Sequence, residues 1–84
     1  MSDFRIATLE YRNDQLHVSW THNFLKTENF CVILDQNGSC EFRTTRDPQN
    51  MILENVVPGE YLVKVQVLGD GEIRETPGKI ITVG

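Results

Sequence analysis

The segment 59–69, GEYLVKVQVLG, alternates apolar and polar side chains almost without interruption. A period of two is typical of a β-strand with one buried face. The side chains predicted to point into a core are Tyr61, Val63, Val65 and Val67. The Pro58-Gly59 pair at the start of the segment favours a turn, because proline fixes φ and glycine accepts positive φ. The segment therefore predicts a turn followed by a long core strand, and it carries no chemistry of its own.

The same period recurs in shorter segments, each bounded by turn-forming residues. Strands are expected over 3–12, 15–21, 30–35, 40–45, 51–56 and 79–83. Asn37-Gly38, between two of these segments, is a hairpin signal. The further core residues predicted are Leu16, Val18, Trp20, Phe30, Val32, Leu34, Leu53 and Val56. No segment has helical periodicity over eleven residues, so we expect an all-β fold, a two-sheet antiparallel sandwich of about seven strands, in one domain over residues 1–84.

The charge balance argues against nucleic acid as a partner. The chain has 8 basic and 12 acidic residues and a net charge of −4, whereas duplex binding depends on clustered Lys and Arg that neutralise phosphates. No apolar run approaches the length of a membrane span. The first ten residues lack the order of a secretion signal. We therefore expect an intracellular or virion-associated protein if the chain is complete, and an extracellular one if it is an excised domain.

The two cysteines, Cys31 and Cys40, have three possible states. Free thiols are favoured, because nothing in the sequence marks an oxidising compartment. A disulfide between neighbouring strands is the alternative, since nine positions and a turn separate the two residues. A zinc site is the remaining state, but two isolated cysteines lack partners at ligand spacing.

Few polar side chains are arranged for catalysis. His17 is expected on the outer face of its strand and His22 in the following loop, both solvated and neither beside a nucleophile. Cys31 could act as a nucleophile only if a histidine approached it. The sequence GDGE at 69–72 lacks the alternating oxygen ligands of a calcium loop and is interpreted as a hairpin tip. We expect no enzyme activity, no cofactor and no required metal.

Two segments resemble a known family. LHVSWT at 16–21 is similar to the second strand of a fibronectin type III domain, which typically ends in a core tryptophan. The segment 51–71 resembles the family's later strands, with an apolar residue, a Pro-Gly turn, a tyrosine and an alternating strand that leads into a glycine-bearing loop. The resemblance covers nearly the whole chain. Only Glu60 separates the Pro-Gly pair from Tyr61, where the family commonly has two residues, and this argues against the usual tyrosine-corner hydrogen bond.

The resemblance implies a non-catalytic protein-interaction or spacer module. Its loops or one sheet face would contact a protein partner, or the sandwich would hold neighbouring domains apart. The alternative is a structural component of a phage or another macromolecular assembly, such as a decoration or tail protein, where similar sandwiches occur.

One candidate for partner binding is the end of the sandwich that carries the loop 21–30. Phe24 and Leu25 in this loop are expected to approach the turn that holds Asp70 and Glu72. The competing expectation is that one of the two apolar residues covers the core as a lid. We expect this end to contact a foreign ligand.

The other candidate is the outer face of a sheet. Alternation places Cys31 and Ile33 on one strand and Leu62 and Leu68 on its neighbour, all facing outward. Solvated faces of antiparallel sheets are usually more polar, and a contiguous apolar patch often marks a contact surface. We expect this face to serve self-association, unless its apolar side chains are scattered or covered by neighbours.

Overall fold

The structure, a computed structural model, describes residues 3–84, which form eight β-strands and no helix. The strands are β1 (Arg5–Arg12), β2 (Gln15–Thr21), β3 (Phe30–Gln36), β4 (Ser39–Thr45), β5 (Asn50–Glu54), β6 (Gly59–Gly69), β7 (Glu72–Glu75) and β8 (Lys79–Val83). The predicted all-β fold is confirmed. β7 is the one strand that the sequence segments above do not contain.

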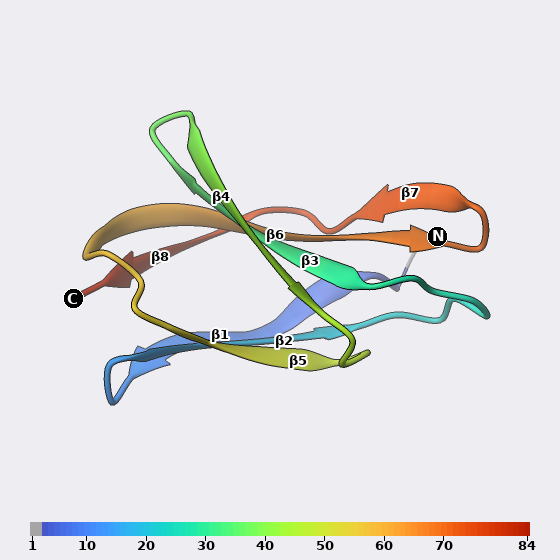
Figure 1. Cartoon of the computed structure of the whole chain (residues 1–84), viewed down its shortest axis with the longest axis horizontal. Coiled ribbons are helices and arrows are strands. Elements are labelled where there is room, and N and C mark those ends of the chain that lie inside the picture. Colours follow the sequence, from blue (N-terminus) through green and yellow to red (C-terminus); the bar gives the residue numbers. More distant parts are fainter. Residues whose placement is uncertain (1–2) are drawn as a thin grey trace.

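The strands form two antiparallel sheets in two layers (Figure 1). One sheet has three strands in the order β1-β2-β5, and the other has five in the order β4-β3-β6-β7, with β8 also paired to β6. The long strand β6 thus pairs with β8 along its first half and with β7 along its second half. This arrangement is the β-sandwich that the periodicity predicted.

Three hairpins close through two-residue turns in which both residues have positive φ. They are Asn13-Asp14 between β1 and β2, Asn37-Gly38 between β3 and β4, and Asp70-Gly71 between β6 and β7. Turns of this kind match the right-handed twist of the strands that they join, and Asn, Asp and Gly tolerate positive φ best. The hairpin expected at Asn37-Gly38 is therefore present.

The core lies between the two sheets and is filled mainly by alternating residues of β2, β3 and β6. Every residue predicted for it is buried except Val56, which is only partly buried. β5 ends at Glu54, and Asn55 has a φ of 58°, so Val56 lies outside the strand alternation. Further buried residues come from the beginning and the end of the chain: Phe4, Ile6 and Val83.

Tyr61 forms a hydrogen bond that the sequence argued against. Its hydroxyl donates to the carbonyl oxygen of Val57 at 2.6 Å. This carbonyl precedes the Pro58-Gly59 turn, so the hydroxyl reaches back across the whole turn. Because only Glu60 separates the turn from Tyr61, the sequence argued against this bond. That expectation was wrong, because the acceptor lies before the turn and the hydroxyl still reaches it.

Thr76 is the buried polar residue between β7 and β8. Its backbone N–H donates to the carbonyl oxygen of Val65 at 2.9 Å, and its Oγ1 accepts from the backbone N–H of Val65 at 3.0 Å. The side chain of Thr76 therefore replaces a backbone carbonyl in the ladder beside β6. The pairing along that strand continues where the chain passes from β7 to β8.

β1 begins and β8 ends at opposite ends of the long axis, which extends over 36 Å (Figure 1). The connection between β2 and β3 and the hairpin between β6 and β7 lie at the end where β1 begins. Within residues 3–84, the structure has no helix that could cross a membrane.

Candidate functional site

The segment 22–29, which joins β2 to β3, is attached to the β6–β7 hairpin by backbone hydrogen bonds. The N–H of Glu28 donates to the carbonyl oxygen of Leu68 at 3.0 Å, and the N–H of Asp70 donates to that of Lys26 at 2.8 Å. Segments about forty positions apart in the sequence are therefore held together by backbone hydrogen bonds and an antiparallel bridge between Thr27 and Gly69.

The carboxylate of Asp70 adds two further bonds to this attachment. Its Oδ1 accepts from the backbone N–H groups of Leu25, at 2.9 Å, and Lys26, at 2.8 Å. The side chain of Leu25 is nevertheless 93% exposed. The structure thus brings Leu25 to the turn that holds Asp70, with the backbone fixed and the apolar side chain in solvent.

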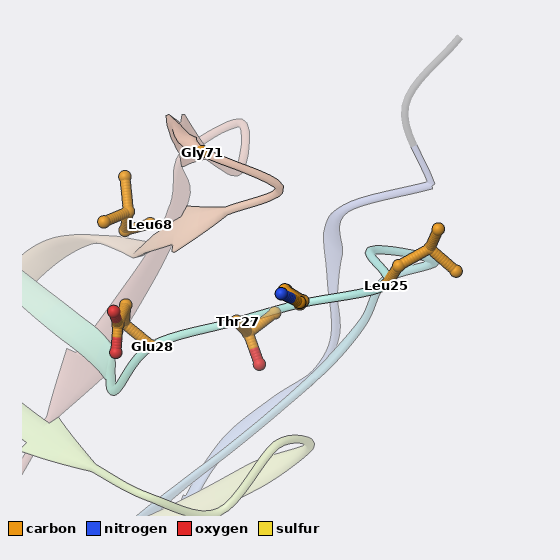
Figure 2. A pocket seen from close by; sticks show the side chains of 6 residues that line it. Leu25, Thr27, Glu28, Leu68 and Gly71 are labelled. Carbon is orange, nitrogen blue, oxygen red and sulfur yellow. The ribbon is translucent and has the colours of Figure 1, made fainter.

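A groove of about 550 Å³ lies between this segment and the hairpin, and Figure 2 shows it from close by. We call it the loop-end groove; it is lined by Leu25, Lys26, Thr27, Glu28, Leu68 and Gly71. Glu28 and Leu68 lie close together at one end of the groove, and Leu25 projects outward at the other (Figure 2). The exposed Ile73 of β7 lies directly opposite Leu68 and extends the apolar surface beside the groove.

Glu72 is exposed at the start of β7 and does not line the loop-end groove. Its Oε2 lies 3.2 Å from Nη2 of Arg74. Of the two acidic residues predicted for this end, Asp70 therefore orders the loop, and Glu72 forms a surface ion pair.

Phe24 covers the core as a lid and is not an exposed contact residue. This agrees with the alternative expectation, that one of Phe24 and Leu25 would cover the core. Its ring packs edge-on against Phe4 at 5.2 Å between centroids, and the guanidinium of Arg74 lies 5.6 Å from its centroid. A Cβ at Gly69 would lie 2.9 Å from this ring. The ring is therefore enclosed by the hairpin backbone, the arginine and the core, and Leu25 alone of the expected pair is accessible.

The two histidines are partly buried, so the expectation that both are solvated was wrong. His22 Nδ1 accepts from the backbone N–H of Phe24 at 3.1 Å, and its ring stacks on that of Phe24 at 5.4 Å. His22 thus supports the lid and needs an unprotonated Nδ1 to do so. On the three-stranded sheet, Nε2 of His17 is buried without a hydrogen-bond partner among residues 3–84.

The outer face of the five-stranded sheet differs from the expected patch. Ile33 is only 9% exposed, so its assignment as an accessible contact was wrong. It lies on the inner strand β3, directly between Phe42 on β4 and Lys64 on β6, and these longer neighbours flank it on both sides. Leu62 is partly buried, whereas Leu68 is exposed and belongs to the loop-end groove.

Two exposed residues on this face were missed by the sequence argument. Phe42 is 63% exposed and Ile80 is 68% exposed. The register of the Asn37-Gly38 hairpin pairs Phe42 with Ile33. This turn was therefore the sequence signal that places Phe42 on the same face as Ile33. No comparable signal marked Ile80, because the two consecutive isoleucines in KIITV hide the alternation.

Both cysteines are free, and the disulfide alternative is excluded by the register. Cys31 pairs with Thr44, and Cys40 lies four positions earlier on β4. Four residues of strand span about 13 Å, well beyond the roughly 7 Å between Cα atoms that a disulfide can bridge. Burial raises the pKa of the Cys31 thiol above its usual value, and a backbone hydrogen bond from Arg43 acts in the opposite direction.

Within residues 3–84, no three His, Cys, Asp or Glu side chains gather closely enough to hold a metal ion. The sequence matches no protein-family model, and a comparison with curated proteins gave no similar sequence. Any function must therefore be argued from the residues themselves.

Proposed function

We propose that the chain is a non-catalytic protein-interaction module of the fibronectin type III-like kind and that it binds its partner at the loop-end groove. The family assignment is supported by the strand order, β1-β2-β5 facing β4-β3-β6-β7. It is also supported by the buried Trp20 at the end of β2 and by the hydrogen bond from Tyr61 to Val57. These features concern the core, so the binding function needs support from the surface.

The observation that carries the proposal is the rigid backbone beneath Leu25. A loop that only connects two strands does not need an exposed leucine with its amide fixed by a carboxylate. Burial of the exposed leucine against a partner would contribute about 1.5–3 kcal/mol. Because the hydrogen bonds to Asp70 already fix the loop, binding would lose little conformational entropy.

The groove indicates the kind of partner. Its apolar contacts come from Leu25 and Leu68, with Ile73 beside them, and its charged groups are one cation, Lys26, and one anion, Glu28. A protein segment that places one or two apolar side chains over the leucines fits this surface. The balanced charges favour neither a strongly acidic nor a strongly basic partner.

The proposal is tested by selecting from a displayed library of random twelve-residue peptides on the wild-type protein. Peptides that bind the groove should lose at least about tenfold in affinity for Leu25→Asp, because a charge then meets their apolar anchor. Ile52→Asp is the matched control. Ile52 is also an exposed aliphatic residue, at 52%, but it lies on the other sheet.

The expected result is a family of related peptides that bind wild type and Ile52→Asp equally and Leu25→Asp weakly, measured by titration calorimetry. Selected peptides that bind Leu25→Asp as tightly as wild type would exclude the groove as the site. A selection that enriches no peptide would favour the spacer role, for which it is suitable that β1 begins and β8 ends at opposite ends of the sandwich (Figure 1).

A structural component of a larger assembly is the second candidate. It is favoured by a second apolar surface, on the five-stranded sheet, that contains the exposed Phe42 and Ile80. Two separate contact surfaces suit a subunit that joins several neighbours. The genes beside the parent reading frame distinguish the two candidates, since tail or baseplate genes indicate an assembly and flanking domains in the same frame indicate a module.

A further inference from the structure

The middle of the five-stranded sheet carries four outward-facing side chains in a regular block. On β3 these are Ile33 and Asp35, and on β6 they are Leu62 and Lys64. Ile33 pairs with Lys64, and Asp35 pairs with Leu62. The two aliphatic residues therefore occupy one diagonal of the block, and the two opposite charges occupy the other.

The aliphatic diagonal continues onto both neighbouring strands. Phe42 of β4 lies opposite Ile33, and Ile80 of β8 lies opposite Leu62. These four residues form a band across four strands, which we call the sheet stripe: Phe42, Ile33, Leu62 and Ile80. Its two ends are its most exposed parts. Ile33 is 9% exposed and Leu62 is partly buried, so the accessible apolar surface of the stripe lies mainly at Phe42 and Ile80. A solvated antiparallel face usually carries polar side chains, so these exposed apolar ends favour a partner that covers them.

We propose that a second copy of this chain covers the sheet stripe in a symmetric, face-to-face dimer. A two-fold axis that runs along the stripe places the stripe of one copy on that of the other. The same rotation exchanges the two sides of the stripe. Lys64 of each copy then lies over Asp35 of the other, so the dimer contains this charge pair twice.

Charge also selects this axis over the other one. A two-fold axis across the stripe would superpose the stripes too, but it would place Lys64 over Lys64 and Asp35 over Asp35, and like charges repel. The charged groups are held in place within the subunit. Nζ of Lys64 lies 3.2 Å from Oε1 of Glu75, and Oδ1 of Asp35 accepts from the N–H of Gly38 at 2.9 Å.

The size of the face sets the strength of the contact. Four strands about 4.8 Å apart and some seven residues long at about 3.3 Å per residue make a face of roughly 450 Å². Stable complexes bury about 800 Å² on each partner. The dimer is therefore expected to be weak and reversible, and to form only at high protein concentration. The net charge of −4 on each copy opposes association further.

The dimer leaves the loop-end groove open. Leu68 lies about 20 Å from Leu62 along β6 at strand spacing. The polar side chains of Lys64, Gln66 and Glu75 lie between the two surfaces, and Lys64 and Gln66 each bond to the carboxylate of Glu75. A dimer would therefore present two grooves, and changes to the sheet stripe should not alter the affinity of the groove for a peptide.

The test is sedimentation equilibrium of the wild-type chain between 10 µM and 1 mM. The weight-average mass should rise from the monomer value of 9.6 kDa toward twice that value. Phe42→Ser, an exposed change on an edge strand, should weaken the dimer by about tenfold. Ile52→Ser, on the outer face of the other sheet, is the matched control and should not change it. A wild-type mass that stays at the monomer value at 1 mM, or an equal loss in the control, overturns the proposal.

The reciprocal charge pair gives a sharper test that does not depend on apolar packing. Lys64→Glu makes both members of the charged diagonal acidic, and Asp35→Lys makes both of them basic. Each variant alone should be monomeric, whereas an equimolar mixture should associate at least as strongly as wild type, because every contact then joins opposite charges. Near-ultraviolet circular dichroism checks that both variants are folded. Folded variants whose mixture associates no better than either alone overturn the proposed axis.

Discussion

Replacing Asp70 separates its two contributions to the loop end. The carboxylate Oδ1 accepts the N–H groups of Leu25 and Lys26, and the residue itself has a φ of 52°. Asp70→Asn keeps an oxygen acceptor and a residue that tolerates positive φ. Asp70→Gly removes the acceptor but keeps a residue that tolerates positive φ, and Asp70→Ala removes both the acceptor and this tolerance.

The costs of the three changes to the free energy of unfolding follow from these differences. Two solvent-exposed hydrogen bonds to a carboxylate stabilise by about 1–2 kcal/mol together, so this is the expected loss for Asp70→Gly. Asp70→Ala adds about 1 kcal/mol, because a side chain with Cβ is strained at positive φ. Asp70→Asn should cost less than about 1 kcal/mol. For a domain of this size, the glycine change should lower Tm by roughly 5–10 °C.

Urea denaturation gives the total loss, and amide hydrogen exchange shows where it arises. The N–H groups of Leu25 and Lys26 should exchange faster in Asp70→Gly, beyond any change in the strands, and nearly as slowly in Asp70→Asn as in wild type. Unchanged exchange of these two amides in Asp70→Gly would refute the argument that the carboxylate fixes the loop.

Three further predictions concern the core and the thiols. Trp20→Ala should destabilise by about 3–5 kcal/mol in a denaturant titration, and wild-type stability of this variant would contradict its place in the core. Thr76→Val keeps the shape but leaves the N–H of Val65 without its acceptor, which should cost about 1–3 kcal/mol in the same titration. N-ethylmaleimide at neutral pH should modify the exposed Cys40 before Cys31, whose pKa is raised by burial. Since only the thiolate reacts, the rate at Cys31 should still be rising with pH above the pKa of an ordinary cysteine, and equal rates at both thiols would contradict this.

The regular strands could be predicted because one buried face leaves a period of two in the sequence. The segment 59–69 became β6 for this reason, and Asn37-Gly38 marked its hairpin because few residue pairs accept two positive φ values. The position of Ile33 could not be predicted from its own strand. Its outward direction was correct, but its burial depends on Phe42 and Lys64, which only the register of three strands places beside it.

The candidate site followed from the sequence only in part. Leu25 and Asp70 were expected at the same end because both lie in connections, but the bond between the Asp70 carboxylate and the backbone has no sequence signature. The burial of Phe24 could not be predicted either. This residue lies in a mostly polar connection, and its ring is enclosed by Gly69 and Arg74 from a distant part of the sequence. Side-chain contacts across distant segments decide these cases, and local patterning does not contain them.

The claim that the loop-end groove is a preformed binding surface is tested most directly by titrating the ¹⁵N-labelled protein with isopropanol, a small apolar probe, and following every backbone amide. We predict that the amides of residues 25–28 and 68–73 shift most and approach saturation, because a preformed groove with apolar contacts from Leu25 and Leu68 binds the probe without rearrangement. Shifts that are spread evenly over the surface, or that are largest around Ile52 on the opposite sheet, would contradict the account.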